Sequence, residues 1–368
     1  MILKYVTRTR IPSRVAQSQQ ISAMALAFSQ QIGASFTLAS SVGTAPRPSY
    51  HQALPLRTIS DKGRYLAACL TAGRHVLGSK GPIVIYTRDI FVALTAATLG
   101  GQAIYEAHKE PKGRAARICT WVLARLPSIR FVYISQALSN FYQQHYRIPD
   151  GRALTAHDGA FPEDYVKLRQ TPTQDLREEL GLPQNKILIV HTGSLYEGRG
   201  AHLFEHLARH SPDVVFVQVG GESEDIDRWS KHYQQLGLEN MLFRPRQTAD
   251  AVRRYQVCAD ILFYMITKDT STYWCCSPLK LFEYMASGTP ILGSAIGSIS
   301  EVLDTQNSFV FDPEDHTSIH SALQSMLTFP KEAQRRANVA LLQIEQEYSW
   351  HIRARRILDF AAGKQVTA

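Results

Sequence analysis

The sequence places a cation and a carboxylate one helical turn apart, at a point where it also signals the start of a helix. Residues 277–290 read SPLKLFEYMASGTP, in which Lys280 precedes Glu283 by three positions. Ser277 is a favoured N-cap residue and Pro278 suits the first position of a helix, while the glycine and the last proline of the segment stop it. The segment therefore predicts a short helix that carries Lys280 and Glu283 on neighbouring turns.

The start of this helix has the properties of an anion site. In the predicted helix the backbone N–H groups of Leu279 and Lys280 lie in the first turn, where no carbonyl of the helix is placed to accept from them. The N-terminal end of a helix also carries a partial positive charge. Lys280 adds a full charge, so a diphosphate would fit there, and the Glu283 carboxylate can accept hydrogen bonds from two ribose hydroxyls. Pro278, Leu279, Lys280 and Glu283 are thus candidates for binding a nucleotide. The alternative is a capped surface helix in which Lys280 and Glu283 form an ion pair.

A glycine-rich segment, HTGSLYEGRG at 191–200, follows the strand-like run 187–190. Gly193 lets the backbone approach a ligand closely, Ser194 follows it, and Arg199 is placed to pair with phosphate oxygens. The other interpretation is an ordinary flexible connection. We expect this turn and the helix above to lie at the carboxyl ends of strands in one sheet, where open α/β sheets bind ligands.

The first half of the chain has its own polar residues at strand ends. The segment YEAH at 105–108 closes a strand, which makes His108 a candidate functional residue with Glu106 as its orienting partner. The alternative is a solvated loop histidine. Residues 87–89, at the end of another strand, and the arginine-rich residues 8–14, expected to form the first loop, are candidates for contacts with an acceptor.

Strand-like and helix-like patterns alternate through both halves, which indicates parallel βαβ architecture. We expect helices at 14–31, 90–99, 113–126 and 345–360, and strands at 2–7, 82–87, 102–106, 131–134, 187–192, 214–219, 241–243, 260–265, 290–293 and 308–311. A polar, charged stretch at 166–183 marks a boundary. The sequence predicts two Rossmann-like domains, at 1–166 and 167–346, followed by a C-terminal helix at 347–368.

Composition narrows the class of protein. The 368 residues carry a formal charge of +8, which favours anionic partners. The apolar runs have the length of strands, and residues 1–10 lack the order of a signal peptide, so we expect a cytoplasmic protein without a spanning helix. Five cysteines without CxxC spacing indicate reduced thiols and no metal site.

The predicted helix 113–126 has apolar residues at helical spacing, with Arg114, Arg117 and Arg125 at other positions. It could rest on an anionic membrane, or it could pack on its own sheet with the arginines solvated. Binding of nucleic acid is not expected, because no recognition motif accompanies the charge.

Four segments together resemble retaining glycosyltransferase family four, also called glycosyl transferases group one. They are residues 277–290, the turn at 192–200, the glycine pair 220–221 and Ser-Trp at 349–350. The resemblance implies a GT-B fold, with two facing Rossmann-like domains and a C-terminal helix that returns to the first. It also implies that residues 167–346 bind the donor nucleotide sugar and that residues 1–166 form the acceptor side.

The resemblance assigns roles to single residues. Glu283 matches the glutamate that holds the donor ribose, Arg199 the basic residue on the diphosphate, and His108 the functional histidine of the first domain. Two positions depart from the family pattern. Cys275 stands where the family has a glutamate that contacts the transferred sugar, and Ser194 where many members have an arginine.

The function implied is transfer of a hexosyl group from a nucleoside diphosphate sugar to a hydroxyl of a glycan or lipid-linked acceptor, with retention and without a metal or other cofactor. The protein would be cytoplasmic, with peripheral contact at the inner face of the membrane. The predicted catalytic residues are His108, Arg199 and Lys280, and the predicted donor-binding residues are Gly193, Ser194, Arg199, Pro278, Leu279, Lys280 and Glu283. Two alternatives stay open: a sugar-nucleotide epimerase or hydrolase of GT-B fold, and a catalytically idle sugar-nucleotide-binding protein.

Overall fold

The computed structural model describes residues 1–44, 56–194 and 200–364. The chain divides into two compact units. Unit 1 comprises Met1–Asp158, Cys275–Ser277 and Trp350–Ala368, and unit 2 comprises Gly159–Trp274 and Pro278–Ser349. The domain boundaries that the sequence analysis places at 166/167 and 346/347 stay a prediction.

Unit 1 contains a seven-stranded parallel sheet in the order β3-β2-β1-β4-β5-β6-β7. Its strands are rich in apolar and β-branched residues and are largely buried, as expected for a parallel sheet covered by helices on both faces. Their bounds are β1 (Ile2–Ile11), β2 (Phe36–Val42), β3 (Leu56–Thr58), β4 (Ile83–Thr87), β5 (Gln102–Ala107), β6 (Ile129–Tyr133) and β7 (Ala153–Thr155).

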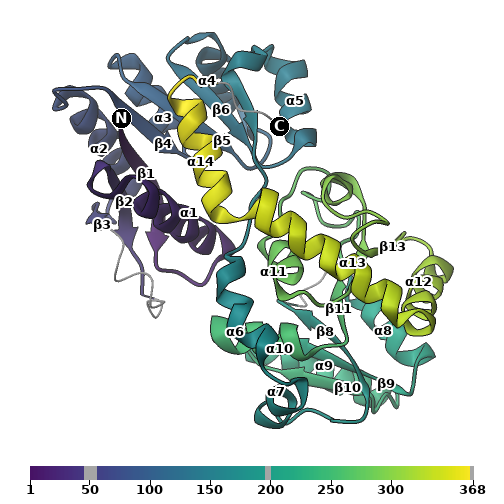
Figure 1. Cartoon of the computed structure of the whole chain (residues 1–368). Coiled ribbons are helices and arrows are strands. Elements are labelled where there is room, and N and C mark those ends of the chain that lie inside the picture. The colour runs from purple at the N-terminus through teal and green to yellow at the C-terminus, as the bar shows by residue number, and fades with distance from the viewer. Residues whose placement is uncertain (45–55, 195–199, 365–368) are drawn as a thin grey trace. The chain divides into compact units, whose positions relative to one another are not determined.

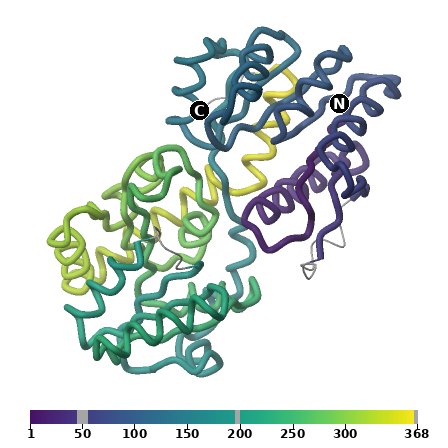
Figure 2. Tube along the Cα trace, turned by 180° about the vertical axis from the view of Figure 1, so that it is seen from behind, coloured from purple at the N-terminus to yellow at the C-terminus, as the bar shows by residue number. Residues whose placement is uncertain are grey.

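The helices of unit 1 form two layers on this sheet. The helix α14 (Trp350–Ala361), at the C-terminal end of the chain, packs against α1 (Ala16–Ile32), and both ends of the chain belong to this unit (Figure 1; Figure 2). In the other layer α2 (Arg64–Leu77) contacts α3 (Ile90–Thr98), and α3 contacts α4 (Arg114–Arg125). The helix α5 (Gln136–Tyr146) follows α4 in the chain and contacts it. The return of the C-terminal helix to the first unit agrees with the expected GT-B arrangement.

Unit 2 contains a six-stranded parallel sheet in the order β10-β9-β8-β11-β12-β13. The strands are β8 (Ile187–Thr192), β9 (Val214–Val219), β10 (Met241–Arg244), β11 (Ile261–Tyr264), β12 (Ile291–Ser294) and β13 (Phe309–Phe311). The helices are α6 (Val166–Gln170), α7 (Thr173–Glu179), α8 (Ala201–His210), α9 (Ser223–Gln235), α10 (Ala249–Cys258), α11 (Leu279–Ser287), α12 (His316–Thr328) and α13 (Pro330–Gln343). One core cluster around Phe204, Phe216 and Phe263 joins the sheet to α8 and α12.

Three expectations from the sequence are wrong in detail. Residues 8–11 belong to β1, with a register irregularity between Val6 and Arg10, and Arg8 pairs with Asp89. Ser277 does not cap α11, because its hydroxyl accepts from the Asp158 amide at 2.8 Å, and Pro278 takes the N-cap place. The expected helix at 345–360 is broken at Ser349, which is extended and pairs with Ala160.

Among the described residues, no helix is long and apolar enough to cross a membrane. The five cysteines are free thiols, and two of them, Cys258 and Cys275, are buried.

Candidate functional site

The turn after β8 lies beside the Lys280 ammonium, and both stand at the carboxyl ends of strands in one sheet, where the sequence analysis places them. Gly193 has a φ of 122°, its N–H donates to the Val219 carbonyl at 2.8 Å, and its own carbonyl accepts from the Gln218 side chain at 2.5 Å. A Cβ at this position would lie 2.6 Å from Nζ of Lys280. Only glycine allows both the backbone conformation and this close approach of the lysine.

A chain of hydrogen bonds fixes where the Lys280 ammonium lies. Nε2 of Gln218 donates to the carbonyls of Gly193 and Gly220, so Oε1 of Gln218 must be the atom that meets Nδ1 of His191 at 2.8 Å. Because Oε1 can only accept, the network assigns the His191 proton to Nδ1. Nε2 of His191 is then left with a lone pair, and it accepts from Nζ of Lys280 at 3.0 Å.

The His191 imidazole positions the Lys280 ammonium without itself adding an opposite charge. His191 and Gln218 are buried at 1% and 0% exposure, whereas Lys280 is half-buried. The neutral imidazole itself removes none of the positive charge of the ammonium. The result is a rigidly presented cation at the N-terminal turn of α11, against a turn whose glycine adds no side chain.

Glu283 lies one turn further along α11 in a second hydrogen-bonded group. Nε2 of Gln256 approaches its Oε2 at 3.4 Å, and Oε1 of Gln256 accepts from the Tyr165 hydroxyl at 2.7 Å. Burial raises the pKa of Glu283, while the Gln256 hydrogen bond and nearby Arg253 and Lys280 oppose the rise. A half-buried carboxylate that receives one long hydrogen bond from Gln256 is suited to accept from hydroxyl groups of a ligand.

The helix α11 is also tied to the turn through Tyr284. The Tyr284 hydroxyl accepts from the Thr192 amide at 2.8 Å and lies 3.2 Å from the Thr192 hydroxyl. Burial raises the pKa of Tyr284 far above neutrality, so the hydroxyl stays protonated. This contact joins the end of β8 to α11 and so fixes the distance between Gly193 and Lys280.

The structure brings together most of the predicted donor residues. Gly193, Lys280 and Glu283 meet as described, the half-buried Ser194 follows Gly193, and Pro278 and Leu279 begin α11. Arg199 lies outside the described residues. Cys275 is buried in the segment that precedes α11, and its carbonyl accepts from the Ser135 hydroxyl at 3.0 Å.

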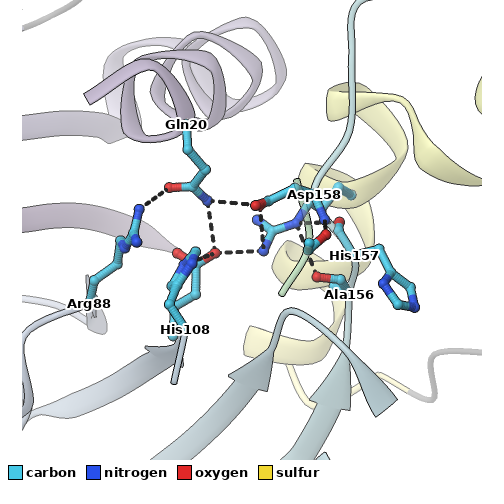
Figure 3. Close-up of polar contacts among 9 residues, drawn as sticks. Gln20, Arg88, His108, Ala156, His157 and Asp158 are labelled. Carbon is cyan, nitrogen blue, oxygen red and sulfur yellow. Dashed lines mark hydrogen bonds and ion pairs between the residues drawn. The ribbon is translucent and has the colours of Figure 1, made fainter. Parts of the chain in front are cut away.

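The polar residues at the strand ends of unit 1 form a buried network around Glu106 and Arg353, much of which Figure 3 shows. Arg353, from α14, places NH2 at 2.5 Å from Oε1 of Glu106 and donates through Nε to the His157 carbonyl at 2.7 Å. Gln20 donates to Glu106 at 3.0 Å and to Asp158 at 3.2 Å, and accepts from Arg88 at 2.7 Å. Glu106, Arg353, Asp158 and Gln20 are each at most 3% exposed.

His108 lies at the edge of this network, close to Glu106, the partner that the sequence analysis names for it. Its Nε2 is 3.2 Å from Oε1 of Glu106, although the ring is not aligned for a hydrogen bond, and its side chain is 17% exposed. Burial and the Arg88 guanidinium lower the pKa of His108 to about 4, against the attraction of Glu106. The imidazole is therefore neutral at physiological pH.

The carboxyl groups of the network respond differently to burial. For Glu106, burial favours the neutral acid, but the Arg353 guanidinium holds the pKa of the carboxyl well below its usual range. For Asp158, burial raises the pKa to about 6. The Arg353 guanidinium opposes this rise, but it lies 3.8 Å from the carboxylate and does not overcome it. Glu106 is thus the permanent anion of the pair.

Sequence reasoning missed the residues that hold these side chains in place. Arg353 is the clearest case, since it stands on the apolar face of α14 formed by Trp350, Ala354 and Ile357. A cation on such a face is a signal for a buried ionic partner. For Gln218 the sequence offers less, because a glutamine at the end of β9 has no spacing that singles it out.

Among the described residues, no group of three or more His, Cys, Asp or Glu side chains is arranged to hold a metal ion.

Comparison with known proteins relates this geometry to a family. The family described as glycosyl transferases group 1 matches residues 172–341. A D-inositol 3-phosphate glycosyltransferase of Corynebacterium aurimucosum is 24% identical over 292 residues, which cover 74% of this chain and 66% of that protein. The chain thus matches slightly less than two thirds of the length of that relative.

Solved structures share the fold over nearly the whole chain. The structure of Anabaena Alr3699/HepE in complex with UDP gives a TM-score of 0.77 at 16% identity, covering 98% of this chain and 100% of that one. Its complex with UDP-glucose gives a TM-score of 0.75 at 14% identity, covering 98% and 99%. The predicted GT-B fold is therefore confirmed, and residues 172–341 match the glycosyl transferases group 1 family.

The lowered pKa of His108 predicts a pH dependence of stability. An unfolded chain protonates this histidine near pH 6.5, but the folded chain resists until about pH 4. The stabilisation that the neutral His108 gives to the folded state is complete above pH 6.5 and is lost as the pH falls towards 4. The free energy of unfolding should decrease by up to about 3 kcal/mol over this range. Urea unfolding of the parent and of His108→Asn should therefore differ in pH slope over this window.

The matched control is His145→Asn, since His145 is an exposed histidine of unit 1. It should keep the parental slope. If His108→Asn also keeps that slope, the imidazole is not held neutral by its surroundings.

Proposed function

We propose that this protein transfers a hexosyl group from a nucleoside diphosphate sugar to a hydroxyl acceptor with retention of configuration. The observation that carries the proposal is the Lys280 ammonium, held by His191 at 3.0 Å beside the Gly193 turn and at the start of α11. A cation, a helix N-terminus and a bare backbone together favour a diphosphate. The group 1 match at residues 172–341 and the UDP-bound HepE neighbour support this interpretation.

Glu283 would bind the ribose of the donor. Its carboxylate is half-buried and receives only a long hydrogen bond from Gln256 among the contacts described. Two vicinal hydroxyls that donate to it would favour its ionised form and so offset the effect of burial on the pKa of Glu283. Lys280 and Glu283, on successive turns of one helix, would then select a nucleotide over a simple phosphate.

Charge that develops on the leaving diphosphate would be stabilised by Lys280, Arg199 and the amides at the start of α11, with no metal or other cofactor. His108 would have a different role. As a neutral imidazole it can exchange hydrogen bonds with a sugar hydroxyl or a backbone carbonyl, so it would orient the donor sugar rather than attack it. Ser194 would lie along the phosphates without adding charge.

The acceptor would be a hydroxyl of a glycan or a lipid-linked molecule, and the reaction would take place in the cytoplasm, where nucleotide sugars are its co-substrates. The alternative functions, an epimerase or hydrolase and an idle binding protein, use the same nucleotide site. Cys275 favours the idle alternative, because a thiol cannot replace a carboxylate as acceptor of sugar hydroxyls. Transfer and donor hydrolysis, assayed on the same preparation, distinguish the three.

Two substitutions separate the parts of the nucleotide site. Lys280→Met should weaken UDP about tenfold or more in calorimetry while leaving uridine unchanged, because the ammonium meets only the phosphates. Glu283→Gln should weaken both ligands by a similar factor, because the ribose is common to them. Lys268→Met and Glu314→Gln, an exposed pair in the same unit, are the matched controls and should bind as the parent does. Equal binding of UDP by the Lys280→Met protein contradicts the diphosphate assignment.

Transfer should survive chelation, because cationic side chains and helix amides are proposed to stabilise the leaving group. Activity in EDTA is expected to equal that of the untreated protein. A loss that Mg²⁺ or Mn²⁺ restores would show that a metal carries this charge instead.

His108→Ala should keep the affinity for UDP yet lower the rate of transfer by about a hundredfold, the scale expected when alignment of the sugar fails. The measurements are calorimetry with UDP and initial rates with UDP-sugars under saturating donor. His145→Ala is the control histidine. Transfer by His108→Ala at the parental rate would return this residue to a structural role.

A further inference from the structure

Three adjacent helices of unit 1 have an unusual composition. The helices α2, α3 and α4 contain five arginines and no aspartate or glutamate. The arginines are Arg64 and Arg74 in α2 and Arg114, Arg117 and Arg125 in α4. Surface helices normally mix both signs of charge, whereas the Asp, Glu, Lys and Arg residues of α2 and α4 are all arginines and α3 has none of the four.

The same helices expose large apolar side chains. Half of the large apolar residues exposed in the described part of the chain belong to this layer, and each is 40 to 72% exposed. They are Tyr65, Leu66, Leu70 and Leu77 of α2, Phe91 and Leu99 at the two ends of α3, and Ile118 and Trp121 of α4. Scattered exposed residues need no explanation, but a concentration on neighbouring helices marks an interaction surface.

These residues lie on one outer face. The helix α2 buries Ala68, Ala72 and Gly73 and exposes Leu66 and Leu70, which are four residues apart. The connections β3-α2-β4, β4-α3-β5 and β5-α4-β6 all run in one direction across the sheet, so right-handed crossovers place the three helices on the same side. A Cβ at Gly73 would meet the Leu99 side chain at 3.0 Å, which shows how closely α2 and the end of α3 approach.

The helix α4 shows how charge and apolar surface combine. Arg114, Ile118, Trp121 and Arg125 follow one another at helical spacing on its exposed side. The Arg125 guanidinium lies 3.5 Å from the centre of the Trp121 ring and donates to the Trp121 carbonyl at 2.9 Å. An indole flanked by arginines is suited to the boundary between lipid headgroups and acyl chains, where a ring can insert while the cations stay with phosphates.

We propose that the outer face of α2, α3 and α4 is a docking surface for a lipid bilayer with anionic headgroups. The charge requires an anionic partner, and the exposed leucines, isoleucine and tryptophan require an apolar one. A nucleic acid offers no apolar layer, and a second copy of the chain would oppose one positive face with another. An anionic bilayer supplies both properties at once. This inference is independent of the proposed transfer reaction, although it would place a lipid-linked acceptor beside the protein.

The test is sedimentation of the full-length protein with two kinds of vesicle, one of phosphatidylcholine alone and one that also contains about 30% phosphatidylglycerol. The anionic lipid gives the second kind a strongly negative surface. The parent should bind the anionic vesicles and release them as salt rises to about 0.5 M, because surface charges are then screened. The variant Arg114→Gln/Arg117→Gln/Arg125→Gln should bind about a hundredfold more weakly. Leu66→Ser/Leu70→Ser/Ile118→Ser should also weaken binding while keeping its dependence on salt.

The control is Arg209→Gln/Arg228→Gln/Arg335→Gln, which removes three exposed arginines of unit 2 and leaves the total charge equal to that of the first variant. It should bind as the parent does. Equal binding by the two triple arginine variants, or no binding by the parent, overturns the proposal. Dimerisation that the serine variant abolishes, with no vesicle binding by the parent, would assign the face to a second copy of the chain instead. Calorimetry with UDP on each variant shows that the nucleotide site is intact, so a failure here is distinct from a failure of the proposed function.

Discussion

Buried polar groups must find partners, and this requirement organises both units. The carboxyl ends of the strands of a parallel sheet lie at one edge, and polar side chains from neighbouring strands meet there. Few backbone groups remain to pair with these side chains, because the strands use theirs in the sheet. In unit 2 the His191 and Gln218 side chains leave neighbouring strands and satisfy each other before either reaches Lys280. In unit 1 Oε1 of Glu106 accepts from Arg353, on a helix that is distant in sequence. Lys280 and Glu283 each contact a side chain that is at most 1% exposed, His191 and Gln256 respectively.

The two networks use different chemistry for a physical reason. A carboxylate beside Lys280 would bind it more strongly than an imidazole, but it would also cancel the positive charge that a diphosphate needs. The neutral Nε2 of His191 fixes the position of the ammonium and leaves its charge intact. Glu106 has the opposite requirement, because a fully buried carboxylate without a cation would be costly. Arg353 meets that need, and it leaves Glu106 ionised close to a histidine that stays neutral.

The sequence predicts the elements well where local patterns are strong. The strand at 187–192 and the helix that carries Lys280 and Glu283 lie where expected, since apolar runs and glycine stops are local signals. The strands β2 and β3 and the helix α2 lie in a region where the sequence analysis predicts no element, and β3 has only three residues, too few for a periodic pattern. The N-cap assigned to Ser277 failed for another reason: its hydroxyl is used by Asp158, more than a hundred residues away, and no local rule contains that contact. Long-range partners such as Arg353 escape prediction on the same ground.

Arginine illustrates how environment decides the role of one residue type. Arg353 and Arg125 both stand beside a tryptophan on an amphipathic helix of unit 1, so their local sequences give similar signals. Arg353 lies on the buried side of α14, where the carboxylate at the end of β5 reaches it, and its charge is consumed within the protein. The helix α4 has no acidic residue, and Arg125 turns back on its own tryptophan and carbonyl, so its charge remains available to a partner outside the protein. What separates the two is the carboxylate that a strand end supplies, which means that the positions of acidic residues, rather than of basic ones, determine where this positive chain offers its charge to other molecules.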